Sequence, residues 1–391
     1  MITEKLTQEQ RLAVDRIKGK VCLRAGAGTG KTSVLVHRYL NIMRKGLADN
    51  VSIDRVLSSI LAVTFTRRAA KEMRERIEKE LIIFFPGKED LSALIQVSTI
   101  DSFCIRILRE KSVLLGIDSD FNVLDEVEAK LLFFQKSRQV LNREALPEIE
   151  IDKSVDGFLS DVFKFIQKLK SMGTTPDLFY KTIHARPFSV PSSSIKLSVE
   201  SVRLAKLIHR LYFVYEETLR QENLFDFHRL LLEVYNLWEK YASVKKEYQE
   251  KYQYILIDEY QDTSPLQDRM LKVLAELNNN YFVVGDAKQA IYGFRGGEPR
   301  NILDYEKETG ENCFSLTRNF RSYEEILEVV NRTLKDRIKG YEEIHSYRSG
   351  RRKLCELLLA PDPAREARFI GQRILSLFEE GYSPGDIVVL L

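Results

Sequence analysis

The segment from Val21 to Thr32 constrains the fold of this chain more than any other stretch. It reads VCLRAGAGTGKT, which is a short apolar run, then a glycine-rich run, then Lys31-Thr32. The apolar residues between Val34 and Leu40 recur at helical spacing. A strand, a glycine-rich turn and a helix in this order form the surroundings that a phosphate-binding loop requires.

The chemistry of such a loop depends on backbone and side-chain groups together. Glycines let successive backbone N–H groups point at phosphate oxygens, and the helix N-terminus adds a partial positive charge. We expect Lys31 to reach the β- and γ-phosphates and the Thr32 hydroxyl to bind Mg²⁺. The usual pattern has glycine where this chain has Ala25. The predicted nucleotide-binding residues of the loop are Ala25, Gly26, Ala27, Gly28, Thr29, Gly30, Lys31, Thr32 and Ser33.

Length, charge and cysteine usage limit the class of protein. The 391 residues are enough for two or three domains, and 44% of them are hydrophobic, as in globular proteins. The net charge of +3 predicts that any nucleic-acid surface is a local patch. The four cysteines are far apart and read as reduced thiols. The polar N-terminus and the absence of a long apolar run predict a cytoplasmic protein without membrane contact.

A second chemical motif lies in the later half of the chain. Tyr254 to Ile257 reads as a buried strand, and Asp258-Glu259 follow at its carboxyl end, where ligands bind in open α/β sheets. We expect Asp258 to hold Mg²⁺, usually through water, and Glu259 to orient or deprotonate the attacking water. Asp-Glu alone is a weak signal, but after an apolar strand and downstream of a phosphate loop in the same chain it strongly indicates a nucleotide-hydrolysing site.

A glycine-rich segment follows the next predicted strand, Tyr281 to Val284. Gln289 is a neutral donor and acceptor that suits sensing of a γ-phosphate. Tyr292 and Phe294 alternate with glycines and precede Arg295, which predicts a stacking platform for single-stranded nucleic acid. The alternative is that both rings belong to the core.

Two other segments have two interpretations each. Gln10 can complete a capping box with Thr7, or its amide can read the adenine edge. The strand predicted over 57–66 leads into a helix that starts with Arg67-Arg68. This arrangement suits a phosphodiester backbone and one stacked base. Taken alone, a solvated charged helix face is the favoured interpretation of the arginines, because most charge runs are of that kind.

The middle and the end of the chain carry fewer signals. A strand is predicted over 96–100, with Asp101 as the cap of a helix over 103–115. Residues 116–217 read as a charged helical insertion, with Asp125 capping a helix over 126–140 and no catalytic motif. Near the end, Arg318 and Arg321 follow a strand, and further strands are predicted around 353–359 and over 387–391.

Taken together, these motifs resemble the UvrD/Rep family of superfamily-one DNA helicases, with some similarity to helicase subunits of bacterial recombination helicase-nucleases. LTQEQ resembles the Q motif, AGAGTGKT motif I, AVTFTRRAAKEM motif Ia and QVSTIDSF motif Ib. LIDEYQDTS resembles motif II, VGDAKQAIYGFRG motif III and LTRNFRS motif IV. The motifs occur in the family's order and cover the chain except for the helical insertion.

The resemblance implies roles that spacing alone does not. Gln10 would read adenine, and Phe320 would stack on that base against Arg38. Gln289 would couple the γ-phosphate to the DNA site, and Arg321 would be an arginine finger. The implied catalytic residues are Lys31, Glu259, Gln289 and Arg321. The implied DNA contacts are Thr64, Phe65, Arg67, Thr99, Tyr292, Phe294 and Arg295.

Two positions and one region depart from the family pattern. Asp101 stands where many members carry His, and Arg67 where many carry Asn. Motifs V and VI have no match before Leu391. The resemblance therefore implies a shortened chain whose ATP site lacks one wall.

The expected fold is an α/β P-loop protein with a RecA-like parallel sheet, a helical insertion and an incomplete second RecA-like domain. The predicted domains are 1A over 1–109 and 216–298, 1B over 110–215 and the first part of 2A over 299–391. The expected function is a monomeric, ATP- and Mg²⁺-dependent 3′–5′ translocase on single-stranded DNA and duplex junctions, with repair or recombination proteins as partners. The alternatives are a fragment that binds nucleotide and DNA but hydrolyses little, and the motor subunit of a helicase–nuclease.

Overall fold

The computed structural model describes residues 6–143, 154–184, 199–293, 296–338, 341–348 and 355–390. The chain divides into two compact units, Met1–Asn319 and Phe320–Leu391. We describe each unit by itself.

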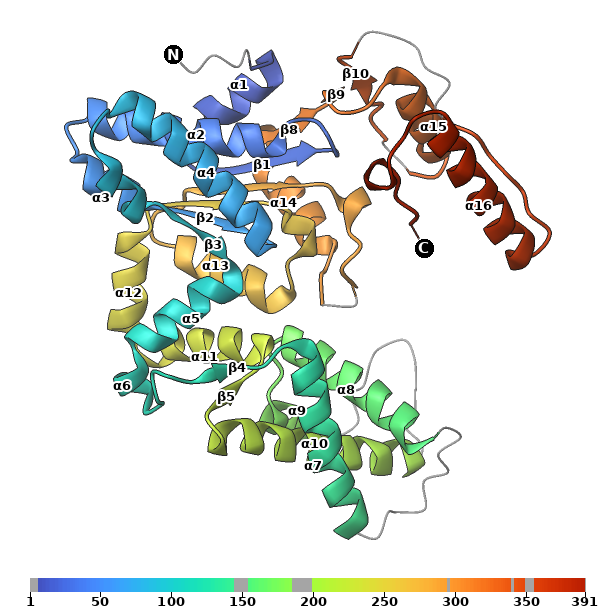
Figure 1. Cartoon of the computed structure of the whole chain (residues 1–391). Coiled ribbons are helices and arrows are strands. Elements are labelled where there is room, and N and C mark those ends of the chain that lie inside the picture. Colours follow the sequence, from blue (N-terminus) through green and yellow to red (C-terminus); the bar gives the residue numbers. More distant parts are fainter. Residues whose placement is uncertain are drawn as a thin grey trace. The chain divides into compact units, whose positions relative to one another are not determined.

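The first unit is built on a six-stranded sheet with the strand order β3-β2-β6-β7-β1-β8 (Figure 1). Every neighbouring pair in this sheet is parallel. The strands are β1 (Lys20–Ala25), β2 (Ile60–Thr64), β3 (Gln96–Thr99), β6 (Tyr254–Ile257), β7 (Tyr281–Gly285) and β8 (Cys313–Leu316). Parallel sheets buried on both faces are typical of α/β proteins. The predicted α/β fold class is therefore confirmed.

Helices cover both faces of this sheet because successive strand residues point to opposite sides. Leu61 and Val63 join the core on one face, and Ile60 and Ala62 the core on the other. The second face carries α1 (Gln8–Asp15), α2 (Lys31–Ala48), α3 (Ile53–Ser58) and α4 (Arg67–Phe84). The first carries α5 (Ile100–Glu110), α11 (Phe227–Lys240), α12 (Ala242–Lys251), α13 (Pro265–Ala275) and α14 (Arg300–Thr309).

The segment between β3 and β6 contains a helical insertion with a core of its own. Its apolar residues, among them Phe133, Phe163 and Tyr215, form a separate cluster. Its helices are α7 (Glu126–Arg143), α8 (Val155–Ser171), α9 (Pro176–His184) and α10 (Val199–Gln221). The short helix α6 (Ser112–Leu115) precedes the insertion, and its Leu115 packs against the core of the sheet. The short strands β4 (Asn122–Val123) and β5 (Leu224–Phe225) pair in parallel where the chain enters and leaves the insertion. The helical character predicted for this segment is confirmed for the residues of it that the structure describes.

Some predicted boundaries are wrong in detail. Leu57 ends up in helix α3, so β2 starts later than the strand predicted over 57–66. The single helix predicted over 103–115 is two helices, α5 and α6, which are separated at Lys111. Thr99, not Asp101, caps α5, because its hydroxyl accepts a hydrogen bond from the backbone N–H of Ser102.

The edge strand β8 changes the predicted division of the chain. It pairs with β1 from Cys22 opposite Cys313 to Ala25 opposite Leu316. Because of this pairing, residues 299–319 belong to the first compact unit, whereas the sequence assigned them to the second RecA-like domain. The names 1A, 1B and 2A for the parts of the chain remain predictions.

The second unit contains α15 (Glu324–Lys335) and α16 (Pro363–Glu379), with β9 (Arg318–Asn319) just before it and β10 (His345–Ser346) within it. Residues 355–359 and 387–390 are not strands, so the strands predicted there are wrong for the residues described. An extended segment becomes a strand only through hydrogen bonds to a neighbour. The remaining short helices are η1 (Glu89–Leu94), η2 (Tyr260–Asp262), η3 (Ala287–Gln289), η5 (Gly310–Asn312) and η6 (Pro384–Asp386).

Candidate nucleotide and nucleic-acid site

The loop between β1 and α2 has the backbone of a phosphate-binding loop. Gly28 and Gly30 have φ angles of 76° and 89°, in the left-handed region that favours glycine. Gly30 also allows a close approach, because a Cβ at this position would lie 2.7 Å from Nε2 of Gln10. The loop turns directly into α2 at Lys31. The predicted strand, loop and helix are therefore present.

Side chains from outside the loop fix two of its carbonyl groups. Nε2 of Gln10 donates to the Thr29 carbonyl at 3.1 Å, and Nδ2 of Asn319 donates to the Ala27 carbonyl at 2.6 Å. Inside the loop, the Thr29 hydroxyl donates to the Gly26 carbonyl at 2.8 Å.

The structure favours the capping interpretation of Gln10. Its Oε1 accepts from the backbone N–H of Thr7 at 3.0 Å, which completes the capping box. Since Nε2 is bonded to Thr29, both ends of the amide are engaged within the protein. The side chain is 5% exposed. A contact between Gln10 and adenine stays a prediction.

Residues from three predicted motifs meet at Lys31. Its Nζ donates to Oε2 of Glu259 at 2.8 Å and lies 3.5 Å from Oε1 of Gln289. Glu259 follows β6 and Gln289 follows β7, so parallel strands deliver both side chains to the edge of the sheet where β1 ends. Nε2 of Gln289 in turn donates to Oδ2 of Asp286 at 2.8 Å.

The two acidic residues after β6 have different surroundings. Glu259 has φ 49° and ψ 47°, a left-handed backbone that is rare outside glycine and is found at functional sites. Asp258 is 8% exposed, and its Oδ1 accepts from the backbone N–H of Glu259 at 3.0 Å. Burial and the neighbouring Glu259 carboxylate raise the pKa of Asp258 to about 7. A bound cation would favour the ionised form.

Oxygen donors suited to Mg²⁺ are present near Lys31. The Asp258 carboxylate and the Thr32 hydroxyl are the kinds of ligand that this hard cation takes. Within the described residues, the Thr32 hydroxyl has no hydrogen-bond partner, so it is available as a ligand. The neighbouring Ser33 hydroxyl lies 3.3 Å from Nδ1 of His37. The residues present fit the predicted ion.

Two predicted DNA-stacking rings come together at the same edge of the sheet. The centroids of Phe65 and Tyr292 are 4.6 Å apart, and their planes are inclined by 37°. Both side chains are half-buried. The other two predicted contacts of that segment, Phe294 and Arg295, lie outside the described residues.

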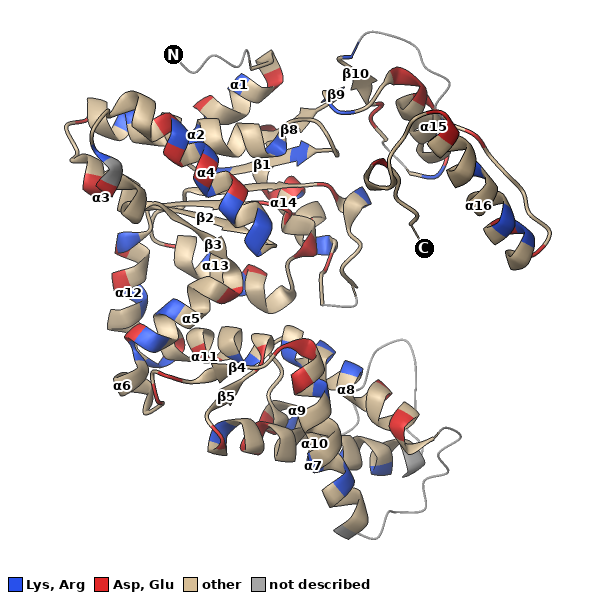
Figure 2. Ribbon diagram, in the orientation of Figure 1, with Lys and Arg blue, Asp and Glu red and all other residues tan. Residues whose placement is uncertain are grey.

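Of the remaining predicted DNA contacts, two threonines are buried and one arginine is exposed. The Thr64 hydroxyl donates to the Thr66 carbonyl at 3.0 Å, and the Thr99 hydroxyl lies 2.8 Å from that of Ser102. Arg67 is exposed at the start of α4 and has no ion pair within the parts of the chain described. Farther along α4, basic and acidic residues alternate (Figure 2) and form three ion pairs four residues apart.

These threonines and Phe65 line a cavity of about 520 Å³. Asp101 also lines this cavity, together with residues of α7 and α8 in the insertion and residues of α11. The cavity therefore joins the predicted DNA path to the helical insertion.

The family model described as the UvrD/REP helicase N-terminal domain matches residues 6–310. The chain belongs to the UvrD/Rep helicase family. It is 30% identical to "ATP-dependent DNA helicase PcrA" of Staphylococcus aureus over 397 aligned residues, which cover 98% of this chain and 47% of the relative. It is 32% identical to "DNA helicase II" of Rickettsia typhi, over 99% of this chain and 53% of the relative.

The chain thus spans about half the length of these relatives of the UvrD/Rep family. None of the helices in the described residues combines the length and apolar character needed to cross a bilayer.

The UvrD/Rep resemblance placed three further residues, Arg38, Phe320 and Arg321, at the nucleotide. Arg38 is 1% exposed; its guanidinium donates to the Ala13 and Ile17 carbonyls and lies 4.1 Å from the centre of the Phe282 ring. It is buried against α1, and a role of Arg38 in stacking on adenine stays a prediction.

Phe320 and Arg321 open the second compact unit. Within that unit the Phe320 ring lies 5.0 Å from the ring of Tyr347, and Arg321 is exposed. Their roles at the nucleotide remain predictions.

Sequence reasoning missed several residues of the site. Gln261 joins the acidic pair to the next strand, because its Nε2 donates to Oε2 of Glu259 at 2.7 Å and its Oε1 accepts from the backbone N–H of Asp286 at 3.0 Å. Gln261 and Asn319 both lie inside quoted motifs, so their place in the sequence could have drawn attention to them.

Proposed function

We propose that this chain binds and hydrolyses ATP as the motor of a DNA helicase. One observation carries the proposal: Lys31, Glu259 and Gln289, from three separate motifs of a helicase family, form one hydrogen-bonded group at the end of β1. Phosphoryl transfer needs a cation on the phosphates and a group that positions water, and these side chains supply both.

The proposed roles follow from the chemistry of each side chain. The N–H groups of the loop and the Lys31 ammonium bind the phosphates and stabilise the charge that develops on them. The Glu259 carboxylate orients the attacking water and accepts its proton. Gln261 holds that carboxylate in place.

We assign the Mg²⁺ site to Thr32 and Asp258. Bound there, the ion would neutralise charge on the phosphate oxygens. Asp258 is placed for this role by its position at the end of β6, and its burial favours an ionised form only when a cation lies nearby.

On the nucleic-acid side we propose single-stranded DNA as the ligand, with Phe65 and Tyr292 stacking on bases and Arg67 binding the backbone. Gln289 links the nucleotide site to the proposed DNA site, since its side chain contacts Lys31 and it lies three residues before Tyr292 in the sequence. Changes at the γ-phosphate are thereby passed to the aromatic pair.

The finer parts of the proposal rest on the resemblance. They are movement in the 3′ to 5′ direction, action at duplex junctions in repair or recombination, a monomeric state, a cytoplasmic location, and Arg321 as an arginine finger. The division into 1A, 1B and the first part of 2A belongs to the same set.

The test is the ATPase rate of the chain with and without oligo-thymidine, compared with Glu259→Gln. We expect hydrolysis that DNA stimulates and that the variant lowers at least about a hundredfold while nucleotide binding is kept. Equal rates in both proteins would contradict the proposed role of Glu259.

The division of the chain favours a second candidate, a fragment that binds nucleotide and DNA but hydrolyses little. Lys31 and Glu259 lie in the first compact unit and Arg321 belongs to the second, so nucleotide can bind through the first unit without Arg321. Binding of ATP without measurable hydrolysis in the same experiment would support it. A helicase–nuclease motor remains a further alternative, testable by co-purification with a nuclease subunit.

A further inference from the structure

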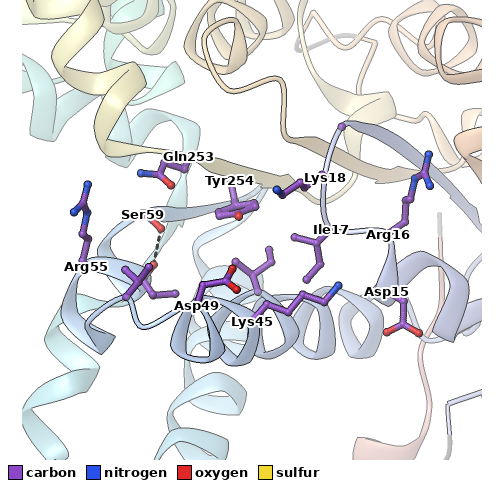
Figure 3. A pocket seen from close by; sticks show the side chains of 15 residues that line it. Asp15, Arg16, Ile17, Lys18, Lys45, Asp49, Arg55, Ser59, Gln253 and Tyr254 are labelled. Atoms are coloured by element: carbon purple, nitrogen blue, oxygen red, sulfur yellow. Dashed lines mark hydrogen bonds between the residues drawn. The ribbon is translucent and has the colours of Figure 1, made fainter.

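A groove crosses the end of the sheet opposite to the phosphate loop. Gly19, Ser59 and Gln253 line it and lie just before β1, β2 and β6, while residues of α2 and α3 form its other side (Figure 3). Its volume is about 730 Å³. None of the residues proposed above to bind nucleotide or DNA lines this groove.

The inner surface of the groove is apolar, with spare hydrogen-bonding groups. Ile17, Ile42 and Val56 line it and are buried, and the ring of Tyr254 is half-buried beside them. Considering only the described residues, neither the Tyr254 hydroxyl nor the side-chain amide of Gln253 has a hydrogen-bond partner. A ligand would therefore bind more tightly if it carried one apolar group to pack on this surface and polar groups to hydrogen-bond with Tyr254 and Gln253.

Cations outnumber acidic groups around the rim. The cations are Arg16, Lys18, Lys45 and Arg55, and the acidic residues are Asp15 and Asp49. Across the described ranges, none of these cations has an ion pair or a side-chain hydrogen bond. Unpaired cations around a concave surface attract an anionic ligand, and salt screens that attraction.

The arrangement of the charges favours an extended ligand. Arg55 lies at one end of the groove and Arg16 at the other, with Lys18 and Lys45 between them (Figure 3). A single phosphate group is held by donors that converge on one point, which these side chains do not do.

The acidic residues distinguish a peptide from a nucleic acid. Asp49 lies between the cations (Figure 3), where a uniformly charged phosphodiester chain would be repelled. A peptide can place carboxylates on the cations and a backbone N–H on Asp49. The predicted DNA contacts also lie at the other end of the strands, since Thr64 ends β2 and Ser59 precedes it.

We propose that this groove binds an acidic peptide segment of a partner protein. Its carboxylates pair with Lys18, Lys45 and Arg55, and one apolar side chain packs against Ile17 and Tyr254. A contact held mainly by exposed cations suits weak, salt-sensitive binding in roughly the micromolar range. This function is independent of ATP hydrolysis.

The test uses the whole chain and a short fluorescein-labelled peptide of aspartate and glutamate residues around a central phenylalanine. Fluorescence anisotropy is measured for the wild type, for Lys18→Glu combined with Arg55→Glu, and for Lys246→Glu. Lys246 is exposed on α12 outside the groove and serves as the matched control. We expect the double variant to bind at least about tenfold more weakly and the control to bind like the wild type. Circular dichroism and nucleotide binding confirm that each variant is folded.

Three results would overturn the proposal. The wild type does not bind the peptide, the double variant binds it with unchanged affinity, or the control loses as much affinity as the double variant. Inorganic phosphate and oligo-thymidine are measured in parallel. If the double variant weakens binding of either of these and the peptide does not bind, the groove serves phosphate groups and the proposal is wrong. The ATPase result stands in every case.

Discussion

The rings of Phe65 and Tyr292 lie 4.6 Å apart, although they come from distant parts of the sequence. Phe65 follows β2, and Tyr292 follows the turn after β7. The sequence allowed two interpretations of the Tyr292 ring, a stacking surface or part of the core. Both rings are half-buried, so they support each other and still expose part of their surface.

We expect Phe65→Ala to weaken binding of oligo-thymidine by about 1–3 kcal/mol, because one base loses its aromatic partner and Tyr292 loses its neighbour. Fluorescence anisotropy at one fixed salt concentration measures the effect. Phe65→Tyr keeps the ring and should bind nearly as well as the wild type. Wild-type affinity in Phe65→Ala would show that this ring does not contact DNA.

Gly30→Ala should destabilise the chain more than Gly19→Ala. Both glycines have positive φ, 89° and 85°, and a Cβ in that region costs about 1–2 kcal/mol. Only Gly30 also has a close neighbour, Nε2 of Gln10, whereas nothing lies within 4 Å of a Cβ at Gly19. Urea unfolding gives the two free energies, and equal losses would contradict the steric part of the argument. In a Gln10→Ala background, adding Gly30→Ala should cost only the backbone part, because the clashing Nε2 is gone; the Gln10→Ala variant alone is the reference.

Gln261→Ala should lower the rate of ATP hydrolysis about tenfold with little change in KM for ATP. The side chain contacts Glu259 and the backbone of Asp286, so it positions the carboxylate that activates water. Steady-state kinetics separate kcat from KM. A rise in KM alone would mean that Gln261 supports binding of ATP instead.

Lys170→Met should destabilise the fold by about 3–5 kcal/mol. Lys170 is 1% exposed and binds the carboxylates of Glu216 and Asp226, the latter at 2.6 Å. Without the ammonium, two buried carboxylates lose their cation. Lys168→Met, on the exposed side of the same helix, is the matched control. Urea unfolding of both variants should show a loss in the first only.

Acidification should weaken the fold through His228. Burial lowers the pKa of His228 to about 4. Between pH 6.5 and 4 the unfolded chain therefore binds more protons than the folded chain, and the free energy of unfolding decreases as the pH is lowered. We expect the wild type to lose about 1–3 kcal/mol more than His228→Gln over this range. Taking the difference from the variant removes the opposite contribution of Asp258, whose raised pKa favours the folded state on acidification. Parallel curves for the two proteins would contradict the shift at His228.

Local features of the fold were predictable from the sequence because they depend on short patterns. The loop before Lys31, the strand ending before Asp258 and the helix beginning at Arg67 all lie where the pattern placed them. Family membership was also predictable, since the motifs keep their order. These signals are local, and each carries its own chemistry.

Features that depend on contacts between distant segments were not predictable. The pairing of β8 with β1 moved residues 299–319 into the first unit, and no local pattern reports a sheet neighbour. The sequence suggested only a place beside adenine for Arg38, and its burial depends on the Ala13 and Ile17 carbonyls, which accept its hydrogen bonds across a distant turn of the chain. The ion cluster around Lys170 joins three helical segments that look like ordinary charged helices when each is read alone.

The two carbonyl groups held by Gln10 and Asn319 have a thermodynamic consequence. They fix the peptide planes after Ala27 and Thr29 through contacts made entirely within the protein. Restricting the backbone of one residue costs about 1–2 kcal/mol of conformational entropy. Since folding already meets this cost, association with a phosphate need not meet it again. The conformation of the loop is therefore set before a phosphate binds, by Gln10 near the start and Asn319 at the end of the first unit's sequence.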